Sequence, residues 1–318
     1  MKMRKYLAFV MLPAIILIFS TNKAQAFVFG SDVHPEYNQN DGSYNDNLDN
    51  LSELLSFFYD DGVGLVGDNV RRGSGTPFQL QLDYYALNYV ISQSTYNWNN
   101  GNYVTNFMSK GNHDLNVNGE INYKTYNLDY DDYYPFEYDN DYLEVFAINS
   151  DYFNDAATPG ILYAWLETQR SNGKVKVIMS HFPLHTKRTG VGPTPQAQTD
   201  IYNVIDYWTR ENNPARNGGA LDIVFLWGHN HDADLQQREN IDKIAVPGEK
   251  MAISYNPQYN HPNADKILNF TYLNAGFVLK EDGGHMTQIN AWREGYYIVR
   301  CGINGWENCI QLQRKNVQ

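Results

Sequence analysis

The chain has 318 residues, and its 36 acidic side chains outnumber its 24 basic ones, so that the formal net charge is −12. A chain of this length can bury a substantial core, as one large domain or two modest ones. The acidic surface disfavours a polymeric phosphate partner such as nucleic acid and an anionic membrane surface, but a small phosphate ester remains open.

The first 26 residues predict a signal peptide. Basic residues in "MKMRKY" precede an apolar run from Leu7 to Phe19, and Ala24-Gln25-Ala26 is a small-residue cleavage site. That order is typical of secretory signal peptides. A membrane anchor is the alternative, but the run is shorter than the ~17 residues that a spanning helix needs. We expect cleavage near Ala26 and a secreted or periplasmic protein without a stable membrane anchor.

Short apolar runs then alternate with helical periodicities along the chain. The predicted strands cover 27–31, 63–67, 103–108, 142–148, 175–180 and 222–227, and the predicted helices cover 48–58, 80–91, 161–170 and 201–208. The tail from about residue 267 looks rich in strands. With no internal repeat and no linker, residues 27–318 are expected to form one α/β domain, with either one mixed sheet or two facing sheets under outer helices.

Residues 115–142 depart from this pattern, because they hold seven tyrosines among many Asp and Asn residues. They predict a long inserted loop, which could be a functional lid. The alternative is an irregular surface cover that its own tyrosines pack.

The two cysteines of the chain, Cys301 and Cys309, lie close together in "CGINGWENC". In an oxidising compartment they are expected to form a disulfide that closes a tight loop. A redox or metal-binding pair is the weaker alternative, since the spacing is not C-x-x-C.

Two histidines follow the predicted strand "IVFLW" in the segment "GHNHD". Side chains at i and i+2 of an extended chain point the same way, so His229 and His231 would project together. A shared ligand such as a metal ion would explain the pair, and two surface histidines in a polar turn are the alternative.

Four more polar clusters stand at the ends of predicted strands. In chain order, the five are Ser31-Asp32-Val33-His34, Gly67-Asp68-Asn69, Gly111-Asn112-His113-Asp114, Ser180-His181-Phe182-Pro183 and Gly228-His229-Asn230-His231. In α/β sheets, ligands bind where the carboxyl ends of the strands converge. The position of these clusters therefore favours a ligand site over a chance arrangement of surface residues.

These clusters resemble the ordered signature of the calcineurin-like metallophosphoesterases, D-x-H, GD, GNH[DE], H and GHxH. The matching segments, "DVH", "GD", "GNHD", "SHFP" and "GHNH", reach from residue 32 to residue 231. The resemblance implies a four-layer αββα sandwich, in which helices flank two facing mixed sheets. It also implies a metal-dependent phosphoric ester hydrolase.

The resemblance further implies a pair of metal ions. One ion would be held by Asp32, His34, Asp68 and His231, and the other by Asp68, Asn112, His181 and His229. His113 would act as the general acid and Asp114 would support it. Nitrogen and oxygen ligands without thiolate suit two divalent ions of zinc, manganese or iron.

We therefore expect an exported phosphatase or phosphodiesterase, in which a metal-bound hydroxide attacks a phosphomonoester or a small phosphodiester. The alternative is a binding protein that holds a phosphorylated partner without turnover. Purple acid phosphatases, which are relatives, carry a tyrosine ligand where this chain has Arg71, which argues against the ferric variety. Arg71 and His185 could contact the substrate phosphate, but solvated loop residues are the favoured reading.

Overall fold

The structure is a computed structural model of the chain. It describes residues 25–57, 61–71, 75–94, 96–97, 102–103, 105–115, 136–139, 141–168, 173–185, 192–211, 223–229, 245–253, 255–256, 261–262, 265–278, 284–293, 295–303 and 309–316. The predicted signal peptide lies outside these residues except for Gln25 and Ala26, which begin the first strand. His231 and most of the predicted insert also lie outside them.

The first large sheet has six strands in the order β17-β16-β15-β1-β2-β5. Their bounds are β1 (Gln25–Gly30), β2 (Gly62–Val66), β5 (Thr105–Ser109), β15 (His285–Trp292), β16 (Gly295–Gly302) and β17 (Cys309–Asn316). Strands β1, β2 and β5 run parallel, and the three C-terminal strands add to β1 in antiparallel fashion. The β-rich tail predicted from about residue 267 therefore supplies three of the strands of this sheet.

The second large sheet has five strands in the order β14-β9-β8-β7-β6. Their bounds are β6 (Phe136–Asp139), β7 (Leu143–Ile148), β8 (Val175–Ser180), β9 (Ile223–Trp227) and β14 (Thr271–Asn274). All but β6 are parallel. The edge strand β6 falls inside the segment that the sequence predicts as an inserted loop, so that prediction was wrong over residues 136–139.

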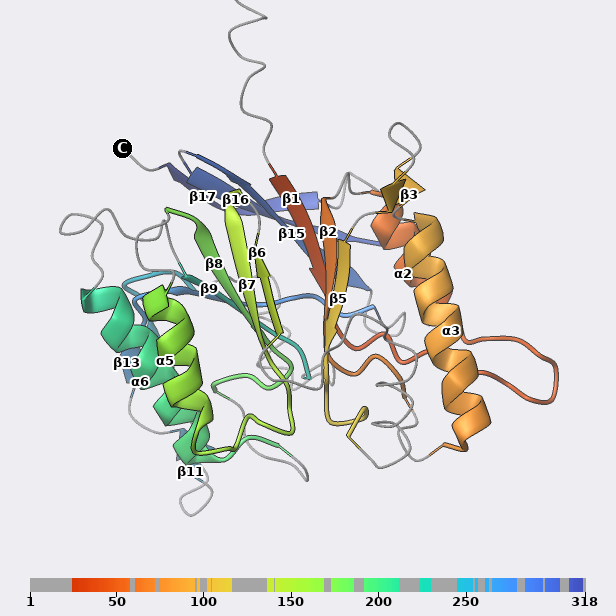
Figure 1. Ribbon diagram of the computed structural model, residues 1–318, viewed down its shortest axis with the longest axis horizontal. Coiled ribbons are helices and arrows are strands. Elements are labelled where there is room, and N and C mark those ends of the chain that lie inside the picture. Colours follow the sequence, from red (N-terminus) through yellow and green to blue (C-terminus); the bar gives the residue numbers. More distant parts are fainter. Residues whose placement is uncertain are drawn as a thin grey trace, which may run out of the picture.

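Helices cover the outer face of each sheet, as Figure 1 shows. Helices α2 (Asn47–Ser56) and α3 (Pro77–Ser94) pack on the first sheet, and α5 (Thr158–Thr168) and α6 (Pro195–Glu211) pack on the second. Phe27 and Phe29 of β1 join a core shared by both sheets, whereas Val28 between them faces the helices. This alternation along the strands produces the four-layer sandwich and confirms the predicted fold class.

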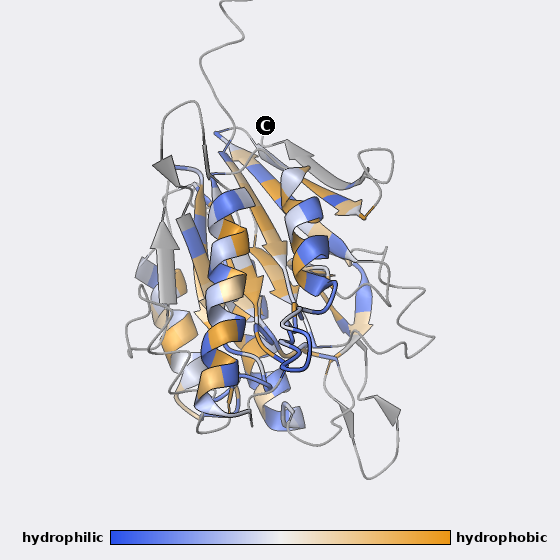
Figure 2. Cartoon of the chain, turned by 90° about the vertical axis from the view of Figure 1, so that its right-hand side faces the viewer, coloured by the Kyte–Doolittle hydropathy of each residue, from blue (hydrophilic) through white to orange (hydrophobic). Residues whose placement is uncertain are grey.

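Helices α3 and α6 begin earlier than their apolar periodicity predicts, because Thr76 and Thr194 cap their first turns. In α3, the Thr76 hydroxyl accepts from the Gln79 backbone N–H at 3.4 Å, and the Gln79 side chain accepts from the Thr76 N–H at 3.1 Å. This reciprocal pair is a capping box. Figure 2 shows the side of the molecule that α2 and α3 cover. Each of these helices has a hydrophobic and a hydrophilic face, and the strands behind them are mainly hydrophobic.

Three short strand pairs complete the described chain. They are β3 (Tyr96–Asn97) with β4 (Asn102–Tyr103), β10 (Lys250–Ala252) with β13 (Asp265–Ile267), and β11 (Tyr255–Asn256) with β12 (His261–Pro262). Within the described residues, no helix is both long and apolar enough to cross a membrane. Cys301 and Cys309 lie opposite each other in the register of β16 and β17, as a linking disulfide would require.

Candidate metal centre

The ends of the two sheets meet where β1 and β9 finish. The backbone N–H of His229, after β9, donates to Oδ2 of Asp32, after β1, at 3.1 Å. The Ser31 hydroxyl lies 2.5 Å from the same Asp32 oxygen and 3.0 Å from the carbonyl of Val66, the last residue of β2. Three strand exits are thus joined around one buried carboxylate.

Asp68, directly after β2, lies at the centre of the site. Its Oδ2 is 3.6 Å from Nε2 of His34, 3.9 Å from Nε2 of His113 and 3.2 Å from Nε2 of His181. Its Oδ1 accepts from the backbone N–H of His113 at 2.8 Å. One carboxylate oxygen therefore faces three imidazoles from three different segments, as expected of a ligand that bridges two ions.

Two motif glycines permit this close packing. A Cβ on Gly111 would lie 2.1 Å from Oδ1 of Asp68, and a Cβ on Gly67 would lie 2.6 Å from Cβ of His181. Gly67 also has a φ of +83°, which side chains other than glycine rarely adopt. The glycines that precede the two motif ligands Asp68 and Asn112 are therefore required by space and by backbone conformation.

His181 follows strand β8 of the second sheet, and its Nε2 lies close to other potential ligand atoms. Its Nδ1–H donates to the Val66 carbonyl at 3.0 Å, which leaves the lone pair on Nε2 when the ring is neutral. That Nε2 lies 3.1 Å from Oδ1 of Asn112 and 3.2 Å from Nδ1 of His229. Several acceptor atoms converge on one point, and a cation there would satisfy them together.

The pKa shifts of His181 and Asp68 show how strongly the buried carboxylates and imidazoles of the site interact. Burial alone would lower the pKa of His181, but the carboxylates of Asp68 and Asp32 raise it to about 9. Burial alone would also raise the pKa of Asp68, yet His181, His34 and His113 hold it far below its usual range. Both shifts favour the positively charged imidazoles and the negatively charged carboxylate, so the buried carboxylates of this cluster favour positive charge beside them.

Strained backbone is concentrated at the candidate ligands. Among the described residues that are not glycine, those with positive φ are Asp32 at 54°, His34 at 45°, Asp68 at 53° and His229 at 72°. Such conformations are costly for residues with a Cβ and cluster at functional sites. All of these residues are candidate ligands, so the strain marks the same site as the side-chain contacts.

His113 lies at the edge of the cluster, where its side chain is 42% exposed. Its Nδ1–H donates to the backbone carbonyl of Arg71 at 2.8 Å, and its Nε2 faces Asp68. The Arg71 guanidinium pairs with Glu36 at 2.9 Å, so this pairing stabilises the segment whose carbonyl orients His113. This role of Arg71 could not be predicted from the sequence, because the contact is made by its backbone carbonyl and does not depend on the residue type.

Asp114 does not contact the His113 ring, and the prediction that it supports this ring is wrong. Its carboxylate accepts from the backbone N–H groups of Gly111, Asn69 and Val70 at 2.9, 3.1 and 3.3 Å. It also accepts from the Asn69 side chain and the Tyr84 hydroxyl, both at 3.1 Å. Asp114 therefore fastens the segments that follow β2 and β5 to each other and to α3, from a fully buried position.

Sequence reasoning also missed the residues that hold the ligands in place. Ser31 binds Asp32, Asn69 binds Asp114, and Tyr84 of α3 joins the same network. Ser31 and Asn69 each stand next to a motif aspartate, which is the signal that could have found them. Tyr84 has no such signal, because it fits the apolar face of its helix.

His185 lies outside this cluster. Its Nδ1 is 2.7 Å from the hydroxyl of Tyr272, which itself accepts from the Leu184 N–H, so the hydroxyl donates to the imidazole. Burial lowers the pKa of His185 to about 4. The neutral ring is packed against Trp227 and Tyr272, which favours the structural role over a contact with substrate phosphate.

The donor set fits divalent metal ions. There are two groups of residues in which the potential ligand atoms all lie within 4.8 Å of one another. One group is His34, Asp68 and His113, and the other is Asp68, His181 and His229. Asp68 belongs to both, as predicted for the bridging ligand, and all donors are nitrogen or oxygen. The first group contains His113, which the sequence places outside the ligand set, whereas the predicted ligand His231 lies outside the described residues.

A two-sheet α/β sandwich with this cluster at its strand ends defines a metal-dependent hydrolase. The family model for calcineurin-like phosphoesterases matches residues 26–233, and the chain belongs to that family. It is therefore a metal-dependent phosphoric ester hydrolase. No curated protein gives a significant sequence match. Among solved structures, a dimetal phosphatase from Danio rerio is similar at 10% identity and a TM-score of 0.49, covering 92% of this chain and 99% of that one.

Proposed function

We propose that the protein is an exported hydrolase with two divalent ions, which cleaves a phosphomonoester or a small phosphodiester. The observation that carries the proposal is the position of Asp68, whose Oδ2 lies within 4 Å of three imidazoles from three segments. A carboxylate with a structural role alone does not require three imidazoles around one oxygen, whereas a carboxylate that bridges two metal ions requires further ligands on both sides.

When bound, two such ions supply an activated water and neutralise charge that builds up on the phosphoryl oxygens. Asp32, His34, Asp68, Asn112, His181 and His229 would hold the ions, with His231 as the further predicted ligand. The buried carboxylates of Asp32 and Asp68 disfavour an anionic ester, and bound divalent ions would offset that charge.

His113 is suited to serve the leaving group. Its exposed ring can reach a substrate, and the hydrogen bond from Nδ1–H to the Arg71 carbonyl leaves Nε2 as the atom that carries the transferred proton. A positioned general acid typically contributes ~10²–10⁴-fold in rate. The Arg71 carbonyl fixes the orientation of the ring and is therefore part of the proposed machinery.

Export and the disulfide remain part of the proposal. The signal-like N-terminus and the facing positions of Cys301 and Cys309 support each other, because disulfides persist in oxidising compartments. Intact mass and N-terminal sequencing of protein recovered outside the cytoplasm test both. A start near Phe27 and a mass 2 Da below the reduced form are expected, whereas an intact N-terminus would contradict export through this segment.

The test of activity is removal and return of metal. We expect chelator to abolish hydrolysis of p-nitrophenyl phosphate and of its bis ester, and manganese or zinc to restore at least one of them, with about two ions bound per chain. The comparison of the two esters decides between a monoesterase and a diesterase. Tight binding of metal and phosphate without turnover would instead favour the non-catalytic binding protein.

A further inference from the structure

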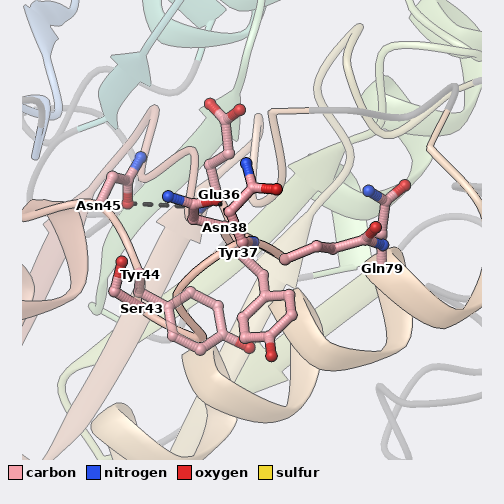
Figure 3. A pocket seen from close by; sticks show the side chains of 9 residues that line it. Glu36, Tyr37, Asn38, Ser43, Tyr44, Asn45 and Gln79 are labelled. Atoms are coloured by element: carbon pink, nitrogen blue, oxygen red, sulfur yellow. Dashed lines mark hydrogen bonds between the residues drawn. The ribbon is translucent and has the colours of Figure 1, made fainter.

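A pocket of about 490 Å³ lies between the loop that follows the first ligands and the start of α3. It is lined by Glu36, Tyr37, Asn38, Gln39, Asn40, Ser43, Tyr44, Asn45 and Gln79. Figure 3 shows the rings of Tyr37 and Tyr44 beside each other, with Gln79 opposite on the helix. The volume is in the ~300–1,000 Å³ range of small-molecule sites.

The loop of residues 36–45 is stabilised by hydrogen bonds within the loop. Tyr37 and Tyr44 form an antiparallel bridge, and the backbone N–H of Asn38 donates to the Ser43 carbonyl at 2.8 Å. The Asp41 carboxylate accepts from the Ser43 N–H and hydroxyl at 3.0 and 2.6 Å. The polar groups at its tip are therefore held in place, and Figure 1 shows this loop projecting outward beside α3.

The pocket adjoins the metal centre. Glu36 is two residues after the ligand His34, which limits their Cα separation to roughly 7 Å. The Asn45 side chain donates to the His34 carbonyl at 2.9 Å. On the other side, Glu36 pairs with Arg71, whose carbonyl holds His113. The pocket therefore lies beside the metal centre on the side of the proposed general acid, and an ester with its phosphate at the ions would extend its alcohol part towards it.

The lining indicates the chemistry of that alcohol. Among the described residues that form it, Glu36 is the charged one, and no cationic side chain is present. A second phosphate or a carboxylate would meet the Glu36 carboxylate, and the Arg71 guanidinium beside it is already paired with that carboxylate, so anionic groups are disfavoured. The half-buried rings of Tyr37 and Tyr44, 5.3 Å apart, offer apolar faces. Amide groups around them can both donate and accept hydrogen bonds.

Part of this hydrogen-bonding capacity is available to a ligand. Within the described chain, the hydroxyl of Tyr37 and the side-chain amides of Gln39 and Asn40 make no hydrogen bond. Paired donors and acceptors beside aromatic faces match a ring or chain that carries several hydroxyl groups. A lipid tail would find too few apolar walls here.

We propose that this pocket binds the alcohol part of the ester, and that this part is a neutral, hydroxyl-rich group, a sugar or another polyol. The proposal deepens the proposed function and rests on it. It predicts specificity among phosphate esters, which the metal centre alone cannot supply because it contacts the phosphoryl group that all of them share.

The experiment compares esters that share the phosphate and differ in the alcohol. The experiment uses the metal-loaded protein as its host exports it. We expect kcat/KM for glucose 6-phosphate to exceed that for methyl phosphate by about tenfold or more, because one or two net hydrogen bonds contribute about that factor. Adenosine 5′-monophosphate and phosphocholine are the competing esters, with adenosine and choline as their alcohols. Equal rates for glucose 6-phosphate and methyl phosphate, or a preference for phosphocholine, would overturn the proposal.

Two substitutions then locate the effect. Tyr37→Ala and Gln39→Ala should each lower the ratio of the two kcat/KM values about fivefold or more, chiefly through KM for glucose 6-phosphate. The control is Gln196→Ala, an exposed glutamine at the start of α6 that pairs with Asp200 and should leave the ratio unchanged. Melting curves check that the loop variants fold, and an equal loss on both esters would contradict the assignment.

The two proposals fail in different ways. If p-nitrophenyl phosphate is cleaved but the sugar phosphate has no advantage, the pocket assignment alone is wrong. If no ester is cleaved with any metal, the hydrolase proposal fails, and calorimetric binding still tests the pocket. In that case glucose 6-phosphate must bind more tightly than methyl phosphate, and Tyr37→Ala must remove the difference; equal binding refutes the pocket.

Discussion

The two large sheets bring different chemistry to the site. The first sheet, through the segments after β1, β2 and β5, provides carboxylates and an amide together with His34. The second sheet, through β8 and β9, provides the imidazoles of His181 and His229. The first is therefore the source of negative charge, and the second is the source of nitrogen ligands, of which His181 is oriented by the backbone carbonyl of Val66.

Neither sheet holds a complete site. Asp68 completes its contacts only because His181 approaches from the other sheet, and the shared apolar core of β1, β8 and β9 sets that approach. The site is therefore a product of sheet-on-sheet packing, and its geometry depends on core residues such as Phe29 and Met179 that never touch a ligand.

The largest expected effect comes from removing the residue that both sheets share. Asp68→Asn takes away the charge that faces three imidazoles, so activity on p-nitrophenyl phosphate should fall by about 10³-fold, with loss of bound metal. Metal content by emission spectrometry and steady-state rates measure this. Asp49→Asn, an exposed acid on α2, is the matched control and should keep both. Retained activity in Asp68→Asn would refute the bridging role.

A smaller effect separates chemistry from metal binding within the first sheet. His113→Asn removes the proposed proton donor but leaves the other ligands, so kcat should fall by about 10²-fold while the metal content stays near that of the unaltered protein. The loss should be greatest for esters with poor leaving groups. A parallel loss of metal would mean that His113 is a ligand, as its place beside Asp68 and His34 would allow.

A purely structural effect is expected at Asp114. Asp114→Asn sets an amide N–H₂ against donors from Gly111, Asn69, Val70 and Tyr84, so the free energy of unfolding should fall by about 1–3 kcal/mol. Urea unfolding measures it. Tyr84→Phe removes one hydrogen bond of the same network and should cost about 1 kcal/mol. If Asp114→Asn were as stable as the unaltered protein, the fastening role would be wrong.

The smallest expected effect is a pH dependence in the second sheet. The pKa of His185 is lowered to about 4, so below pH 6.5 the unfolded chain binds a proton that the folded chain does not. Stability contributed by the neutral ring is present above pH 6.5 and is lost as the pH falls through 4. His185→Gln should therefore show a weaker decline of the melting temperature between pH 6.5 and 4.5, and an unchanged decline would contradict this.

The sequence predicted most elements of the fold because apolar periodicity reports which residues are buried. The run at 175–180 is β8 itself, and the run at 142–148 is β7 with one extra residue. The division into two sheets stayed open, since an apolar run carries no information about its partner strand. Strand β6 was missed because its residues resemble the surrounding Tyr- and Asp-rich segment.

The candidate site was predictable in its residue types and less so in its connections. The order of the motifs predicted Asp68 and His181 as ligands, and in the structure Oδ2 of Asp68 lies 3.2 Å from Nε2 of His181. The partner of His113 is a backbone carbonyl, and Asp114 accepts mainly from backbone N–H groups, so neither contact depends on a residue type that a motif can show. The role of His231 stays a prediction.

The left-handed backbone at Asp32, His34, Asp68 and His229 has a consequence for how the chain can change over evolutionary time. Each position would be relaxed by glycine, by an amount on the order of 1 kcal/mol. Selection for heat resistance alone would therefore erode the ligands one after another. A variant with glycine at one of these positions should therefore lose its activity and melt at a higher temperature than the unaltered protein.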